Sequence, residues 1–198
     1  MTADAGHLVV LPATPDRWDD VVSLLDGDQE RGCWCQPWRG PATAYGLPAG
    51  ESRRAALRVQ LGGDVPPGFI ACLDDVPVGW CGVSVRTETP RLVRSRTIPA
   101  IDDAPVWSIG CFRIRVGYRR RGVATALLAG VVDAARAAGA PGVEAYPVDP
   151  GGRRIDTGFA FVGIASMFDA AGFRRVLQTS AHSAGLPRLL VRLDFEDA

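Results

Sequence analysis

The stretch of residues 112–128 combines the residue types that can bind a phosphate group. It reads as an apolar strand, a turn with three consecutive arginines at 119–121, and a helix that begins near Gly122. The first N–H groups of a helix have no acceptor within the helix, and the positive end of the helix dipole lies there. Gly122 lets an anion approach the backbone closely, Ala124 is small, and Thr125 offers a hydroxyl group. The pattern therefore predicts a phosphate-binding turn in which the arginines add fixed positive charge.

Two common phosphate-binding motifs do not fit this turn. The P-loop requires a Gly-Lys-Ser/Thr ending, and this sequence contains no lysine. The dinucleotide-binding fingerprint requires three glycines at its own spacing, and they are absent. A structural alternative stays open, in which the arginines form a solvated surface beside an ordinary helix start. The long apolar face of the following helix favours the phosphate site.

The same residues carry a resemblance to a known family. The run Arg119-Arg-Arg-Gly122-Val-Ala124 resembles the Arg/Gln-x-x-Gly-x-Gly/Ala motif of the GNAT superfamily of N-acetyltransferases. The preceding Ile114-x-Val-x-Tyr118 and the later Ala165-x-x-Phe168-x-x-x-Gly172-Phe173 are also similar to that superfamily. The resemblance is motif-specific over 106–173 and extends in element order over most of the chain.

The resemblance implies an α/β (α+β) fold with a single domain over residues 1–198. Its twisted, mixed and mainly antiparallel sheet would be splayed at its centre and flanked by about four helices. Acetyl-CoA is the implied co-substrate, and it would lie in the cleft between the fourth and fifth strands. The implied reaction is direct attack of an amine on the thioester, without a covalent acyl-enzyme. The residues that the resemblance places at the coenzyme are Phe112, Arg113, Ile114, Arg119, Arg120, Arg121, Gly122, Val123, Ala124, Thr125 and Phe168.

Two positions depart from the family pattern for proton transfer. Many members have a tyrosine in the short late helix, where this chain has Phe168. Some members have a carboxylate on the fourth strand, where this chain has Ser108. Phe168 cannot donate a proton, so we expect it to pack on the coenzyme.

Three other side chains are candidate catalytic groups. Alternation along the short strand 143–147 places Glu144 and Tyr146 on one face, where the carboxylate could relay a proton through water. Ser166 is a polar residue in the late helix. The structural alternatives are a salt-bridged Glu144, a packed Tyr146 and a surface Ser166.

The segment Cys33-Trp34-Cys35-Gln36-Pro37-Trp38-Arg39 is the second unusual stretch. Trp34 and Trp38 are candidates for a flat or cation-binding surface that contacts the acceptor. Arg39 is a candidate for binding an acceptor carboxylate. A stable zinc site needs four ligands, and no second Cys or Cys–His pair stands nearby, so we expect no metal. A packed aromatic loop is the structural alternative.

Composition excludes several classes of protein. The formal net charge is zero, with 22 basic and 22 acidic residues, which argues against a nucleic-acid binder. No apolar run reaches the roughly 18 residues of a membrane span, and the N-terminus lacks a basic signal-peptide region. Five scattered cysteines do not suggest a disulfide framework. We therefore expect a cytoplasmic protein with no membrane partner.

Hydrophobic periodicity and turn residues predict a mixed α/β order of elements. We expect a loop at 26–49 and a polar connection at 87–104. The expected strands are 8–13, 69–73, 78–86, 106–116, 143–147, 173–179 and 188–195, and the expected helices are 15–25, 51–61, 122–138 and 163–171.

The primary functional hypothesis is an N-acetyltransferase that moves an acetyl group from acetyl-CoA to the primary amine of a small molecule. The alternative is a non-catalytic acyl-CoA-binding sensor on the same scaffold, because both expected proton-transfer positions are changed. The terminal strand pair offers an edge through which a homodimer could form.

Overall fold

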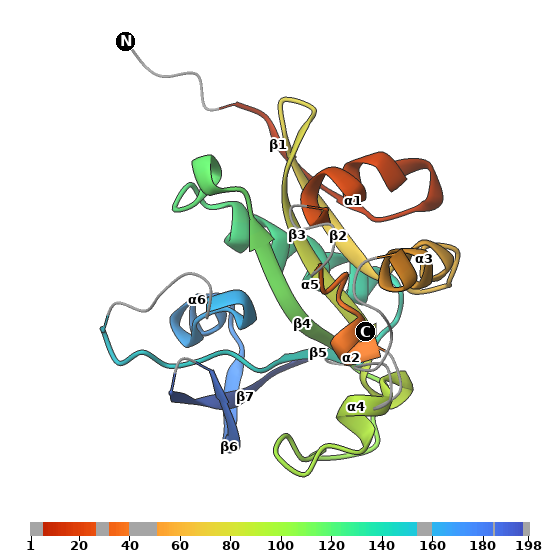
Figure 1. Ribbon diagram of the computed structural model, residues 1–198. Coiled ribbons are helices and arrows are strands. Elements are labelled where there is room, and N and C mark those ends of the chain that lie inside the picture. The colour runs from red at the N-terminus through yellow and green to blue at the C-terminus, as the bar shows by residue number, and fades with distance from the viewer. Residues whose placement is uncertain (1–5, 27–31, 40–50, 154–159, 184, 196–198) are drawn as a thin grey trace.

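The structure is a computed structural model that describes residues 6–26, 32–39, 51–153, 160–183 and 185–195. Its centre is a seven-stranded sheet in the order β1-β2-β3-β4-β5-β7-β6 (Figure 1). Only the β4–β5 pair is parallel among these strands, so the sheet is mixed and mainly antiparallel, as predicted. The strands are β1 (Leu8–Pro12), β2 (Gly68–Leu73), β3 (Val76–Val85), β4 (Trp107–Ile114), β5 (Gly142–Ala145), β6 (Arg174–Ser183) and β7 (Leu186–Asp194).

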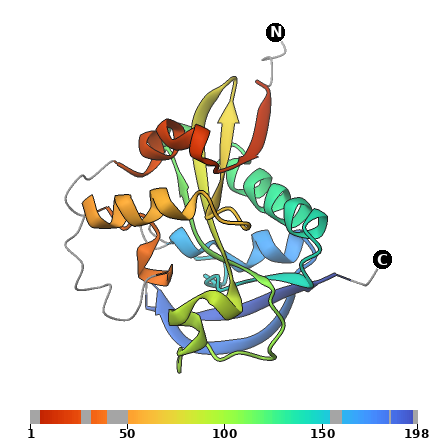
Figure 2. The ribbon, with the colours of Figure 1, turned by 90° about the vertical axis from the view of Figure 1, so that its right-hand side faces the viewer.

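Helices cover both faces of this sheet. In Figure 2, α1 and α3 lie on one side of the strands and α5 lies on the other. The described residues contain α1 (Trp18–Leu25), α2 (Gln36–Arg39), α3 (Glu51–Gln60), α4 (Pro90–Val93), α5 (Val123–Ala137) and α6 (Ala165–Ala170). The expectation of about four helices therefore holds for α1, α3, α5 and α6. The other two are single four-residue turns, which are too short to show a helical period.

Two apolar clusters hold these layers together. One joins α5 and α6 to one sheet face through Leu127, Leu128 and Phe168, all of which are fully buried. The other joins α1 and α3 to the opposite face around Trp80 and Leu57. Because each cluster needs one apolar stripe per helix, the periodicity of α1 and α5 was sufficient to predict both elements.

The sheet opens between β4 and β5. The two strands pair only from Trp107–Val143 to Ile109–Ala145, and the last four residues of β4, 111–114, pair with β3 alone. Beyond β5 the chain continues to Val148, which forms bridges to Ile164 and Arg188 instead. This divergence confirms the splayed centre that the resemblance implies.

A β-bulge in β4 lies at this opening. Gly82 pairs with Cys111 and Val83 pairs with Ile109, so Gly110 is the extra residue. The bulge shifts the alternation, and Ile109 and Phe112 therefore both pack in the cluster with α5.

The remaining differences concern ends of elements. The expected strand 106–116 ends at Ile114 and is followed by a 3-10 turn at Val116–Tyr118. The strand expected to end at 179 continues to Ser183, so part of the expected connection between 179 and 188 belongs to β6. Among the described residues, no helix is long and apolar enough to cross a membrane.

Candidate active site

The turn before α5 has the geometry of an anion-binding helix start. Gly122 is the N-cap of α5 and has a left-handed backbone (φ 78°, ψ −4°). The N–H of Ala126 donates to the Gly122 carbonyl at 2.9 Å. The amides of residues 122–125 precede this bond, so they have no acceptor within the helix. Arg120 is also left-handed (φ 59°), and a turn of this kind gathers successive N–H groups into a concave surface.

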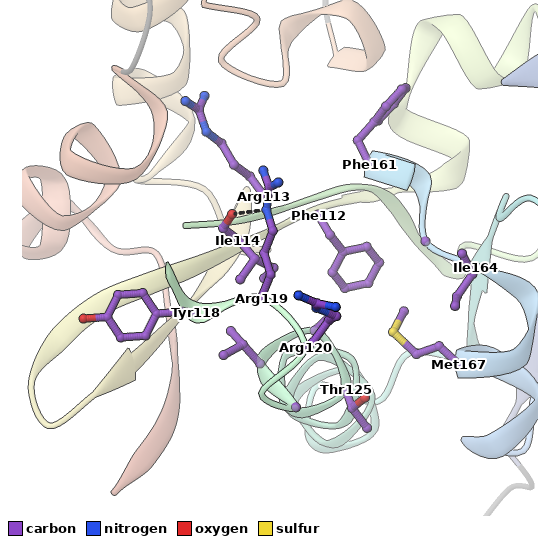
Figure 3. Close-up of a pocket in the computed structure, with 14 residues that line it drawn as sticks. Phe112, Arg113, Ile114, Tyr118, Arg119, Arg120, Thr125, Phe161, Ile164 and Met167 are labelled. Carbon is purple, nitrogen blue, oxygen red and sulfur yellow. Dashed lines mark hydrogen bonds between the residues drawn. The ribbon is translucent and has the colours of Figure 1, made fainter. Parts of the chain in front are cut away.

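A cavity of about 530 Å³ opens directly over this turn (Figure 3). Three segments form its walls: the end of β4, the turn with the first residues of α5, and the segment that leads into α6. Nine of the eleven residues predicted to contact the coenzyme line the cavity: Phe112, Arg113, Ile114, Arg119, Arg120, Gly122, Val123, Ala124 and Thr125. Sequence reasoning missed Tyr118, Phe161, Gly163, Ile164 and Met167, which also line it.

Two predicted coenzyme residues lie off the cavity wall. Arg121 is exposed, and its guanidinium carbon lies 5.7 Å from the centre of the Tyr118 ring. Phe168 is fully buried and packs edge-on against Phe112 and Phe173, with ring centres 6.2 and 5.2 Å apart. Phe168 was expected to pack directly on the coenzyme, but it lies behind the cavity wall. Met167 from the same helix faces the cavity instead.

Gly163 explains the position of Phe168. A Cβ atom on Gly163 would lie 2.7 Å from Cε2 of Phe168, so only glycine leaves room for this ring. Gly163 also has a left-handed backbone (φ 82°). The glycine thus allows the Phe168 ring to pack against Phe112, which lines the cavity.

The arginines around the turn differ in their partners. Nη1 of Arg113 donates to the Leu25 carbonyl at the end of α1, at 3.2 Å. Nε of Arg119 donates to the Ile114 carbonyl at 3.3 Å, a bond that Figure 3 marks. Both arginines line the cavity, but part of the donor capacity of each is used within the protein.

The candidate groups Glu144 and Tyr146 lie together, as alternation predicts, but they are buried and do not line the cavity. Both residues are 0 % exposed. The Tyr146 hydroxyl donates to Oε1 of Glu144 at 2.5 Å and lies 3.1 Å from the Ser108 hydroxyl. Nε of Arg86 is 2.8 Å from the same carboxylate oxygen. This is the salt-bridged alternative, and it removes the direct path from Glu144 to a substrate.

Burial also governs the protonation of this pair. It raises the pKa of Glu144, and the Tyr146 hydrogen bond and the Arg86 charge oppose that rise. Burial raises the pKa of Tyr146 well above its ordinary value. The third candidate, Ser166, is exposed on α6 and does not line the cavity.

The Cys-Trp-Cys segment is mostly structural. Trp34 is 1 % exposed and stacks on Trp18 with ring centres 5.9 Å apart. Nη2 of Arg39 donates to the backbone carbonyls of Pro67 and Val83. Trp34 is therefore not accessible to an acceptor, and the Nη2 donor of Arg39 is already used within the protein.

Trp38 keeps a position suited to substrate contact. It is half-buried and stacks on Tyr146 with ring centres 6.3 Å apart. A Cβ atom on Gly110 would lie 3.3 Å from Cδ1 of Trp38, so the indole lies against the bulge of β4. Gly110 is two residues from Phe112, which lines the coenzyme cavity.

Comparison with known proteins decides the family. Residues 33–153 match the sequence profile of the Acetyltransferase (GNAT) family, which is more than half of the chain. This chain belongs to the GNAT acetyltransferase family. A comparison with curated protein sequences gives no match.

Solved structures agree with the GNAT fold. A NatC complex bound to Gag peptide and CoA is 12% identical, with a TM-score of 0.57, over 96% of this chain and 99% of that chain. NAA60 of Arabidopsis thaliana in complex with acetyl-CoA is 14% identical, with a TM-score of 0.54, over 96% and 100%. A GNAT acetyltransferase from Bacillus cereus is 15% identical, with a TM-score of 0.54, over 97% and 100%. At these identities the likeness concerns the fold.

Family membership confirms the enzyme class and the co-substrate predicted from the sequence: the chain is an N-acetyltransferase that uses acetyl-CoA. In this GNAT chain the described cavity wall has no histidine or carboxylate. The unusual positions Phe168 and Ser108 are both buried, one in the core and one beside Tyr146. The proton-transfer groups expected from the family pattern therefore do not stand at their usual places.

The cysteines of this GNAT chain are free thiols in the described residues. Sγ of Cys35 lies 3.0 Å from Sγ of Cys111, and this contact raises the pKa of Cys35 to about 12. A thiol with such a pKa stays protonated at neutral pH and is a poor nucleophile. Within the described ranges, no group of three His, Cys, Asp or Glu residues could hold a metal ion.

An Arg39→Lys variant should lose stability because the lysine nitrogen is one bond closer to the backbone than Nη2, the single nitrogen that donates to both the Pro67 and the Val83 carbonyl. We expect the free energy of unfolding to fall by about 1.5–3 kcal/mol, measured by urea denaturation. Arg174→Lys is the matched control, because Arg174 is 61% exposed and its pairing with Asp194 contributes little. If the Arg39→Lys variant instead kept its stability and changed its acceptor preference, Arg39 would be an acceptor-binding residue, as the sequence suggests.

Proposed function

We propose that this GNAT enzyme transfers the acetyl group of acetyl-CoA to the primary amine of a small molecule, by direct attack within a ternary complex. The observation that carries the proposal is the cavity that joins the amides at the start of α5 to the open edge of β4. No covalent acyl-enzyme is needed, because the chain only has to bring amine and thioester together and stabilise the developing charge.

The residues present fit the coenzyme in two distinct parts. The amides of residues 122–125, together with Arg119 and Arg120, suit the pyrophosphate, since unpaired N–H groups and positive charge meet there. The unpaired edge of β4 at 110–114 suits the amides of the pantetheine arm. Phe112, Ile164 and Met167 give this arm apolar walls. When bound, acetyl-CoA supplies the activated acetyl group.

Trp38 is the proposed contact on the acceptor side. Its indole lies against Gly110, beside the cavity segment that contains Phe112, and close to Cys111 of β4 and the Cys35 that packs on it. Aromatic walls of this kind suit a compact amine. A peptide N-terminus is the competing acceptor, because the similar NatC complex holds a Gag peptide. The alternative of an acyl-CoA sensor follows from the cavity wall, whose described residues include no carboxylate or histidine.

Two measurements test the proposal. Calorimetry should detect binding of acetyl-CoA to the protein alone, and free-thiol release should then rise when a small amine acceptor is added. The panel should contain amino acids, amino sugars, polyamines and short peptides with free N-termini. Release only with peptides would overturn the small-molecule acceptor, and coenzyme binding without release for any amine would support the sensor.

A further inference from the structure

Arg188, near the start of β7, is a buried cation with unused donor capacity. It is 6 % exposed, and its Nε donates to the Tyr146 carbonyl at 2.8 Å. Its Nη2 atom is buried and has no hydrogen-bond partner among the described residues. None of the ion pairs within those residues involves Arg188, whereas Arg86 and Arg192 both lie close to Glu144. Burying an unpaired guanidinium is costly, so the arrangement suggests an anion that binds there.

The surroundings of Arg188 are aromatic and positively charged. Its guanidinium carbon lies 5.1 Å from the Trp38 ring centre and 5.7 Å from that of Tyr146. The guanidinium carbon of Arg91 lies 5.8 Å from the same Trp38 ring. Burial lowers the pKa of Arg188 to about 10, so the group remains cationic at neutral pH. A second cation near this site would repel a polyamine and attract a carboxylate.

The position of Arg188 relates it to the reaction. Val148 bridges Ile164, which lines the coenzyme cavity, and also bridges Arg188. Trp38, against which Arg188 lies, contacts the β4 bulge at Gly110. Arg188 therefore lies close to the open end of the β4–β5 cleft, on the side where Trp38 packs against the β4 bulge.

We infer that Arg188 is a specificity-determining residue that binds a carboxylate of the acceptor, so the acceptor is an amino acid or another amine that carries a carboxylate. The inference rests on the proposed function and names the substrate class of that site. Trp38 would cover the face of the bound acceptor, while Nη2 of Arg188 would donate to its carboxylate. This role was assigned to Arg39 from the sequence, but Arg39 is held by two backbone carbonyls.

Matched substrates test the inference without any mutation. The standard amino acids and their carboxamides differ in the carboxylate alone, and both series keep the amine. We expect kcat/KM of the best amino acid to exceed that of its carboxamide by at least about tenfold. Equal values for the two series would overturn the role of Arg188 and leave the proposed acetyl transfer intact. Absence of thiol release with every amine, despite coenzyme binding, would instead overturn the proposed function and this inference with it.

Variants locate the effect at Arg188. Arg188→Gln should reduce the ratio between amino acid and carboxamide to about one, mainly through KM, while the Kd for acetyl-CoA stays unchanged. Arg188→Lys should keep part of the preference, because it keeps the charge without the planar fork. Arg174→Gln, at the exposed Arg174 of β6, is the control and should keep the full ratio. If a folded Arg188→Gln variant keeps the wild-type ratio of kcat/KM between amino acid and carboxamide, the inference is contradicted. If the variant does not fold, the ratio measured for the wild type is the test: a value near one contradicts the inference.

Discussion

A Gly122→Val variant should fold and bind acetyl-CoA at least about 100-fold more weakly than the wild type, which corresponds to about 2.7 kcal/mol. Gly122 lines the cavity, and a Cβ atom there would meet nothing within 4 Å in the protein itself. The added side chain would therefore occupy the space into which the helix amides point, where the pyrophosphate is proposed to bind. Calorimetry with acetyl-CoA measures the loss directly.

Backbone strain is the competing explanation, since valine rarely adopts the φ of 78° found at Gly122. Gly139 is a matched control because it has φ 69°, lies just beyond the other end of α5, and also has no atom within 4 Å of its Cβ position. Gly139→Val should lose a similar stability, about 1–3 kcal/mol, and should bind acetyl-CoA normally. Normal binding by Gly122→Val, or equal loss of binding in both variants, would contradict the proposed placement of the pyrophosphate.

The phosphate turn could be predicted from the sequence because its requirements are local. A strand, a glycine at the helix start and flanking arginines all lie within 112–128, and in the structure they form one continuous strand, turn and helix that lines the cavity. The splayed sheet could be predicted only through the family resemblance. Nothing in the residues of β4 and β5 themselves specifies that their pairing stops after Ile109 and Ala145.

Contacts between distant segments set the limit of sequence reasoning. Alternation correctly placed Glu144 and Tyr146 on one face, but their partner Arg86 comes from the turn that directly follows β3, and no local pattern indicates that it contacts them. The orientation of α6 about its own axis is a similar case. Phe168 was expected at the coenzyme from the family resemblance, and the six residues of α6 are too few to show from their own pattern that Met167 faces the cavity instead.

Glu144 gives the second large expected effect, and it concerns stability. A Glu144→Ala variant would leave the Tyr146 hydroxyl and the Arg86 guanidinium buried without their carboxylate. Arg86 cannot avoid the cost of a buried unpaired charge by deprotonation, because an arginine side chain stays protonated in proteins. We expect the free energy of unfolding to fall by about 3–5 kcal/mol in urea denaturation. A double variant, Glu144→Leu with Arg86→Met, should recover most of that loss, because an apolar pair of similar size removes the uncompensated charge.

A Glu144→Gln variant separates a structural role from general-base catalysis. Glutamine still accepts the Tyr146 hydrogen bond, so the loss of stability should be smaller, about 1–3 kcal/mol. Because Glu144 lies off the cavity wall, kcat and the Kd for acetyl-CoA should stay within about twofold of the wild type. If Glu144 were the general base, kcat would instead fall by about 100-fold or more while the coenzyme still bound.

The pH dependence of stability gives an independent check on Glu144. Since burial raises its pKa, the folded protein keeps this proton at pH values where the unfolded chain has lost it. The contribution of this carboxyl group to stability is therefore fully present below its ordinary pKa of 4.5 and is lost as the pH rises through the raised pKa. Glu144→Gln cannot titrate, so the difference in unfolding free energy between variant and wild type should narrow as the pH rises from about 4.5. A difference that widens with pH would mean that Arg86 outweighs burial and holds the pKa of Glu144 below its ordinary value.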